Sequence, residues 1–156
     1  MVGKLITIIV KNKDFLQTYM NQKEILLNQY KLYVNTAEKV SDWRQTSNNF
    51  FLTLNSVLLA FTGFLTTLNF AIWHTILAFA GICISVLWFL TITSFRKLNS
   101  GKFKVIHDME RKLPFKAFGN EWNYLENKYV KISLVEQGIP IIFFLLYISI
   151  IILMLF

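Results

Sequence analysis

The sequence predicts an all-α integral membrane protein with three membrane spans. The stretch from Gln45 to Phe95 contains no Asp, Glu, Lys or Arg over 51 residues, and the stretch from Ile139 to Phe156 adds 18 more uncharged residues. A helix needs about 20 apolar residues to cross the hydrocarbon core of a bilayer. The first stretch is therefore long enough for two crossings, and the second just suffices for one. The hydrophobic content of 54% is typical of this class.

The Lys and Arg residues flank the predicted spans on one side of the membrane. Seven of the 16 precede Gln45, nine lie between Arg96 and Lys131, and none lies in the hairpin turn or after Lys131. This positive-inside pattern predicts a multi-pass membrane protein with the N-terminus and residues 96–138 in the cytoplasm and the C-terminus outside. The net charge of +7 therefore predicts contact with anionic membrane lipids rather than nucleic acid, because no groove-reading motif accompanies it.

The first predicted element is one long helix, which begins near Asp14 and runs from the cytoplasm into the first span. Between Lys4 and Thr62 the chain has neither Gly nor Pro, so nothing interrupts a helix there. Residues 1–47 form its cytoplasmic arm and helix, in which residues 1–10 are either an interfacial anchor or a strand-like arm. Apolar residues at spacings of three and four predict a coiled-coil-like seam. They are Leu26, Tyr30, Tyr33, Ala37 and Val40.

A transmembrane hairpin is predicted at residues 48–95, with spans at about 50–70 and 73–95. Polar residues recur at seven-residue intervals along one side of its first helix. With Thr66 they form a polar stripe of Asn48, Asn55, Thr62, Thr66 and Asn69. Amides and hydroxyls are unfavourable in hydrocarbon unless they are paired. Two interpretations stay open: hydrogen bonds between helices that fix their register, or the lining of a polar path in a ring of subunits.

The second span carries Gly81 and Ser85 on one side, where small residues allow close helix–helix contact. Residues 96–138 then form a basic cytoplasmic helical segment, in which Asn120 is a candidate cap of a short helix. The basic residues of this segment are candidates for contact with anionic lipid or a partner protein. They are Arg96, Lys97, Lys102, Lys104, Arg111, Lys112 and Lys116.

The third span is predicted at residues 139–156, with Pro140 in the first helical turn, where proline is tolerated. The alternative is a hydrophobic helix buried against the hairpin from the cytoplasmic side. Tyr147 and Ser149 are predicted to hydrogen-bond a neighbouring helix.

Arg44 lies on the seam of the first helix at the predicted cytoplasmic boundary. A basic side chain there either extends to the lipid headgroups or forms an ion pair. Its place on the packed face favours an ion pair, for which the candidate partners are Glu121, Glu126 and Glu136.

No motif in the sequence predicts catalysis, a cofactor or a metal site. The only cysteine, Cys83, lies in the second span, the two histidines are far apart, and neither a phosphate-binding glycine loop nor a nucleophile elbow occurs. We therefore expect a protein that is not an enzyme.

Two stretches of sequence, Tyr30–Gly63 and Ser94–Trp122, carry a resemblance to a known family. They resemble the RipA family of octameric bacterial membrane proteins, which is akin to the SLATT group of small two-span membrane proteins. The positions that carry the resemblance are Arg44, Asn48, Phe51, Leu54 and Asn55 in the first stretch, and Arg96, Leu98, Asn99, Lys102, Phe103, Ile106, Glu110, Leu113, Pro114, Glu121 and Trp122 in the second.

The resemblance implies a homo-oligomeric ring, expected to be an octamer, in the bacterial cytoplasmic membrane. For SLATT-like proteins it also implies membrane-disrupting effectors in antiviral or conflict systems. The third span departs from the two-span pattern of that group. We therefore expect a gated pore or membrane-perturbing effector in antiviral defence or stress response. The alternative is a non-conducting oligomeric scaffold that recruits a cytoplasmic partner or sensor, or supports envelope stress tolerance.

Overall fold

The computed structural model describes the backbone of residues 2–66, 71–125 and 132–155, and side chains from Leu16 onward within these ranges, apart from those of Thr66, Ala71, Ser133 and Leu155. These residues form four helices, α1 (Val2–Thr66), α2 (Ala71–Glu110), α3 (Ala117–Leu125) and α4 (Ile132–Leu155), and no strand. Three of them, α1, α2 and α4, are long and apolar enough to cross a membrane. The predicted all-α membrane class is confirmed.

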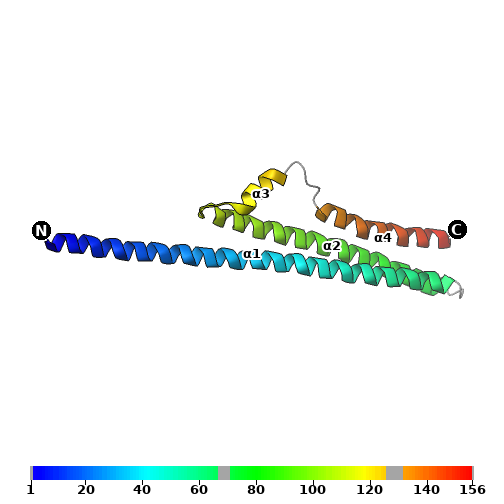
Figure 1. Cartoon of the computed structure of the whole chain (residues 1–156). Coiled ribbons are helices and arrows are strands. Elements are labelled where there is room, and N and C mark those ends of the chain that lie inside the picture. The colour runs from blue at the N-terminus through cyan, green and yellow to red at the C-terminus, as the bar shows by residue number, and fades with distance from the viewer. Residues whose placement is uncertain (1, 67–70, 126–131, 156) are drawn as a thin grey trace.

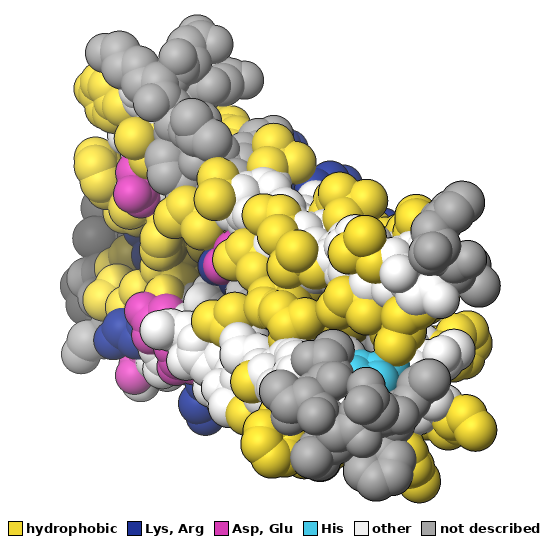
Figure 2. Space-filling model, turned by 90° about the vertical axis from the view of Figure 1, so that its right-hand side faces the viewer, with side chains coloured by type: hydrophobic (Ala, Val, Ile, Leu, Met, Phe, Trp, Pro, Cys, Tyr) yellow, Lys and Arg dark blue, Asp and Glu magenta, His cyan; other side chains and the backbone are white. Residues whose placement is uncertain are grey.

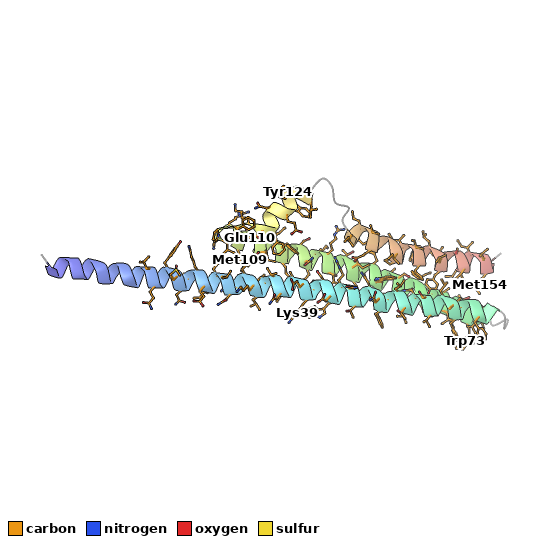
Figure 3. All side chains as sticks on the ribbon, in the orientation of Figure 1. Lys39, Trp73, Met109, Glu110, Tyr124 and Met154 are labelled. Carbon is orange, nitrogen blue, oxygen red and sulfur yellow. The ribbon has the colours of Figure 1, made fainter. Side chains whose placement is uncertain are left out.

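The helices form an elongated bundle around α2 (Figure 1). α1 and α2 lie side by side and antiparallel, and α4 packs along the other side of α2, so that Trp73 and Met154 lie near the same end of the bundle (Figure 3). α3 folds back over the far end of α2. At 1.5 Å per residue α1 is about 100 Å long, so it extends well beyond a bilayer core of about 30 Å.

Matched pairs of side chains fix the register of α1 against α2. From the N-terminal side of α1, Tyr30 meets Glu110, Thr36 meets Lys102, and Asn48 meets Trp88. Residue numbers rise along α1 and fall along α2 from one pair to the next, as antiparallel packing requires. Both helices pass from the predicted cytoplasmic part into the predicted spans without a break, so the two parts are joined by continuous helical backbone.

Three predicted helix starts are wrong, and those of α1 and α4 come first. α1 begins at Val2 rather than near Asp14, because no helix-breaking residue separates residues 1–13 from the rest. Residues 2–10 are therefore helical, not a strand-like arm. α4 begins at Ile132, so Pro140 lies inside the helix and is buried. Proline leaves the carbonyl four residues earlier without its helical donor; packing of the first turns of α4 on α2 offsets this loss.

The third corrected start is that of α3, which begins at Ala117 and not after Asn120. Asn120 lies within the helix, and its N–H donates to the carbonyl of Lys116. The cap comes from the distant carboxylate of Glu110, which accepts hydrogen bonds from Phe118 N and Gly119 N. A contact eight residues away in sequence therefore sets where this helix begins.

The surface of the bundle is mainly apolar along the predicted spans. Seen from the hairpin end, hydrophobic side chains cover most of the described surface (Figure 2). Phe50, Phe61 and Phe64 on α1 and Phe79 on α2 are each more than half exposed. Such a surface fits lipid or neighbouring subunits rather than water.

Candidate functional site

The described part of the polar stripe faces the neighbouring helices of the same chain. Asn55 and Thr62 are 0% and 1% exposed, and Asn48 is half-buried. The side chain of Thr66 and the whole of Asn69 lie outside the described residues. The stripe therefore lies inside the protomer, where each amide and hydroxyl needs a partner.

Asn55 joins all three spans. Its Nδ2 donates to the Phe51 carbonyl of α1 (2.9 Å), and its own carbonyl accepts from the Tyr147 hydroxyl of α4 (3.0 Å). Its Oδ1 lies 3.3 Å from Ser85 Oγ of α2, which also lies 2.8 Å from the Gly81 carbonyl. A hydroxyl has one proton, so Ser85 divides its donation between these acceptors, with the shorter bond to Gly81.

Trp88 gives the stripe a second link between α1 and α2. Its Nε1 donates to Asn48 Oδ1 at 3.0 Å, which pairs the one polar atom of a side chain only 1% exposed. Its ring stacks on Phe51, with centroids 6.0 Å apart and 11° between the planes, and contacts Phe143 of α4. Aromatic packing and one hydrogen bond thus hold this level of the bundle.

Gly81 of α2 lies directly against the side chain of Tyr147 of α4. A Cβ at this position would overlap the ring of Tyr147, whose side chain is fully buried. The small residues therefore make room for an aromatic side chain of the third span. Ser149, by contrast, donates to the carbonyl of Leu146 on its own helix, so the prediction that it bonds a neighbour is wrong.

Arg44 lies against the start of α4, beside Glu136. Arg44 Nε and Glu136 Oε2 are 3.6 Å apart, and about a fifth of each side chain is exposed. At this separation the two groups form an ion pair without a hydrogen bond. Of the other predicted partners, Glu121 lines a cavity with Arg44 and Glu126 lies outside the described residues.

Sequence reasoning missed the role of Glu110, which binds three helices together (Figure 3). The residue is 1% exposed. Its Oε1 accepts from Tyr30 Oη of α1 (3.1 Å) and Phe118 N of α3 (2.9 Å). Its Oε2 accepts from Gly119 N (3.0 Å) and lies 3.5 Å from His107 Nδ1. A buried carboxylate is tolerated because four groups surround it.

Burial alone would raise the pKa of the Glu110 carboxyl, but the hydrogen bonds from Phe118 N, Gly119 N and Tyr30, with His107 beside it, lower the pKa below its usual value. Burial, then the hydrogen bond and charge of Glu110, raises the pKa of the Tyr30 hydroxyl. Tyr30 is thus a donor and Glu110 an ionised acceptor near neutral pH.

Of the basic residues predicted to contact lipid or a partner, Lys102 and Arg96 bond to other helices of the protomer. Lys102 Nζ turns onto α1, where it donates to Thr36 Oγ1 at 3.1 Å and lies 5.7 Å from the centre of the Tyr33 ring. Arg96 is exposed and donates to Gln137 Oε1 at 3.3 Å. The remaining members are exposed, and they are Lys97, Lys104, Arg111, Lys112 and Lys116.

A second line of polar residues, not predicted from the sequence, runs along an exposed flank of α1. Asn49, Thr53 and Ser56 are all exposed, at spacings of four and three. None of their side chains forms a hydrogen bond to another residue that the structure describes. Asn49 and Ser56 each follow a residue of the buried stripe by one position, so they are also seven residues apart. The helical period that predicts the stripe could therefore have predicted this second line as well.

Residues 27–156 match the family model described as "Octameric membrane protein family (8xMP)". No curated protein and no solved structure gives a significant match. The match covers most of the chain, including all of the hairpin and α4, and it fits a homo-oligomer whose spans are still largely exposed in the single protomer. The chain belongs to the octameric membrane protein family.

Proposed function

We propose that this protein is a gated pore or membrane-perturbing effector, and that the exposed flank of α1 carrying Asn49, Thr53 and Ser56 supplies its polar path. The observation that supports it is that these side chains lie in or beside a predicted span yet have no partner in the described part of the protomer. The buried stripe that first favoured a pore is used to pack α1 against α2 and α4.

Three threonine hydroxyls elsewhere in the spans are bonded within their own helix, unlike those of Thr53 and Ser56. Thr62, Thr91 and Thr93 each donate to the carbonyl four residues earlier, within 2.9 Å. Such a bond lets a hydroxyl lie in hydrocarbon at little cost. An unpaired hydroxyl there is unfavourable, so the flank with Thr53 and Ser56 suits water or a second subunit.

The continuous helices offer a route by which a cytoplasmic signal could open such a path. α1 and α2 are bridged outside the spans by Tyr30, Glu110 and Lys102. We expect this end to face the cytoplasm of a bacterial cell, by the distribution of Lys and Arg. A shift at the cytoplasmic end would therefore be carried into the hairpin without crossing a hinge.

The test is membrane depolarisation in a bacterial host after induced expression, followed with a potential-sensitive dye. The variant Thr53→Leu with Ser56→Leu should reduce depolarisation at least about tenfold, because apolar side chains in a narrow path exclude water. The matched control is Thr91→Leu with Ser94→Leu, the same residue pair at the same spacing on α2, which should leave depolarisation unchanged. Unaltered depolarisation in the first variant, with assembly verified by size, would contradict the proposal.

A role in antiviral defence or stress response is supported only by the resemblance to RipA and SLATT-type proteins, and that kinship stays a prediction. Phage plating on hosts with and without the gene would test it. A defence effector should lower plaque counts by orders of magnitude, and the loss should disappear with the Thr53→Leu, Ser56→Leu variant.

The second candidate is a non-conducting scaffold that recruits a cytoplasmic partner. Exposed aromatic side chains outside the spans favour it: Phe115 is 69% and Tyr124 80% exposed. Affinity purification after cross-linking would test it, with Phe115→Ser and Tyr124→Ser expected to lose the partner. A separate variant with Arg111, Lys112 and Lys116 neutralised tests whether their charge contributes to binding the partner. A scaffold should also leave the membrane potential intact.

A further inference from the structure

A cavity of about 890 Å³ lies where the three spans meet the cytoplasmic helices. It opens between α2, α3 and the start of α4; α3 and α4 lie on the same side of α2 in Figure 1. Its polar lining comes from α1, α2 and α3, and consists of Arg44, Arg96, Asn99, Ser100, Lys104, His107 and Glu121. Its apolar lining consists of Phe103, Phe118, Trp122, Leu125, Ile132 and Leu134.

Two cations of the cavity form no ion pair with a described acid. Arg44 is paired with Glu136, and His107 lies against Glu110. Arg96, however, donates only to the neutral amide of Gln137, and Lys104 has no hydrogen bond or ion pair with a described residue. Against these two cations stands the one carboxylate of the lining, that of Glu121. The cavity therefore keeps a net positive charge, which favours an anion and most of all a phosphate group.

The cavity also holds an unused acceptor. The Asn99 Oδ1 atom is buried and has no donor among the described residues. A buried acceptor of this kind is unfavourable until a donor reaches it. Because Glu121 adds a second acceptor to the lining, the complementary ligand carries hydroxyl groups close to its phosphate.

The apolar side of the cavity leads toward the membrane. Ile132 and Leu134 are more than half exposed, and they begin the apolar surface that continues along α4 through Ile141 and Ile142. A ligand with its phosphate between Arg96 and Lys104 could lay hydrocarbon along this surface into the bilayer. A soluble phosphate ester would leave this surface uncovered.

We propose that the cavity binds the headgroup of an anionic phospholipid, with the phosphodiester between Arg96 and Lys104 and a headgroup hydroxyl donating to Asn99 Oδ1. A phosphatidylglycerol-type lipid has this chemistry: one negative phosphodiester, free hydroxyls and two acyl chains. The proposal does not depend on whether the oligomer conducts, since it rests on the charge and shape of one protomer at the membrane boundary.

The test is a binding titration of the full-length protein, purified in an uncharged detergent, with dioctanoyl phosphatidylglycerol, read by native mass spectrometry. Saturable binding is expected, and Arg96→Gln with Lys104→Gln should weaken it at least about tenfold, because two charge-assisted contacts are lost. The matched control, Arg111→Gln with Lys112→Gln, removes the same charge from exposed residues outside the cavity and should change the affinity less than about twofold. Equal losses in the two variants would reduce the effect to surface charge and overturn the proposal.

Three further ligands define the chemistry. Dioctanoyl phosphatidylcholine should bind at least about tenfold more weakly, since its choline carries no hydroxyl and cancels the charge. Glycerol phosphate should not compete at the concentrations at which the lipid binds; competition there would make the ligand a soluble phosphate ester and overturn the lipid assignment.

Phosphatidic acid tests Asn99: the preference for phosphatidylglycerol over phosphatidic acid should fall in Asn99→Leu, and an unchanged preference would remove Asn99 from the site. This variant also serves if the double variant fails to fold.

Discussion

The hydroxyl of Tyr147 donates a hydrogen bond across 3.0 Å to the backbone carbonyl of Asn55, and both residues are fully buried. The bond ties the third span to the first, although most of the packing of α4 is on α2. Asn55 is therefore the residue at which α1, α2 and α4 meet. The hairpin and the third span form one packed unit rather than a hairpin with a loosely attached helix.

Removing this hydroxyl should loosen the third span without breaking the hairpin. Tyr147→Phe keeps the ring against Gly81 and deletes only the hydrogen bond, so we expect a loss of about 1 kcal/mol in the free energy of unfolding. Unfolding in a detergent mixture of increasing denaturing strength measures it. The control is Ser149→Ala, which removes an exposed hydroxyl bonded within its own helix and should change little. Equal effects of the two variants would contradict an interhelical role for Tyr147.

Gly81→Ala should separate α2 from α4. The added Cβ overlaps the buried ring of Tyr147, and overpacking of this kind costs about 1–3 kcal/mol. The control is Gly101→Ala on the same helix, where a Cβ meets nothing within 4 Å. There the higher helix propensity of Ala should instead stabilise by up to about 1 kcal/mol. The two variants are thus expected to shift the melting temperature in opposite directions. An unchanged or raised melting temperature in Gly81→Ala would show that the Gly81 contact is unimportant.

Glu110 should make the docking of α3 sensitive to acid. Its pKa is lower in the folded protein than in the unfolded chain, so its ionised form stabilises the fold above the usual Glu pKa of about 4.3. That contribution is lost as the pH falls through the lowered folded value. Thermal unfolding from pH 7 down to pH 3 should show the loss in the wild type and a weaker pH dependence in Glu110→Gln.

At neutral pH the same substitution should cost about 1.5–3 kcal/mol, because hydrogen bonds to a charged acceptor are lost. Asp108→Asn is the control. Its carboxylate lies 3.5 Å from Arg111, but both side chains are about 70% exposed, and such pairs contribute little. Identical pH profiles for wild type and Glu110→Gln would show that another group governs the acid response.

The sequence was sufficient to find the helices and the face of α1 that packs. Asn48 and Asn55 are seven residues apart, which is close to two helical turns, so their shared face follows from the helical period alone. The helical period does not predict the register of one helix against another. That Trp88 meets Asn48, and that Tyr147 meets the carbonyl of Asn55, depends on how far α2 and α4 slide along α1.

The wrong predicted starts of α3 and α4 have the same origin, because both depend on long-range contacts. Local rules place a helix start at Asn120 or at Pro140. The structure starts α3 where the carboxylate of Glu110 can cap it, and starts α4 early enough for Glu136 to reach Arg44. Neither contact can be inferred from the few residues around each start.

The pair of Arg44 and Glu136 should be coupled in stability, because only about a fifth of each side chain is exposed. Arg44→Gln or Glu136→Gln alone leaves a half-buried charge without its partner, so each should destabilise the fold by about 1–3 kcal/mol. The double variant removes both charges and should cost less than the sum of the two single losses, by about 0.5 kcal/mol or more. Detergent unfolding of the four proteins gives this coupling energy. Arg96→Gln combined with Glu136→Gln is the comparison, since Arg96 donates to Gln137 rather than to Glu136. If the losses of Arg44→Gln and Glu136→Gln simply added in the double variant, the two charges would contribute no coupling energy. The two side chains would then stabilise the fold through packing alone.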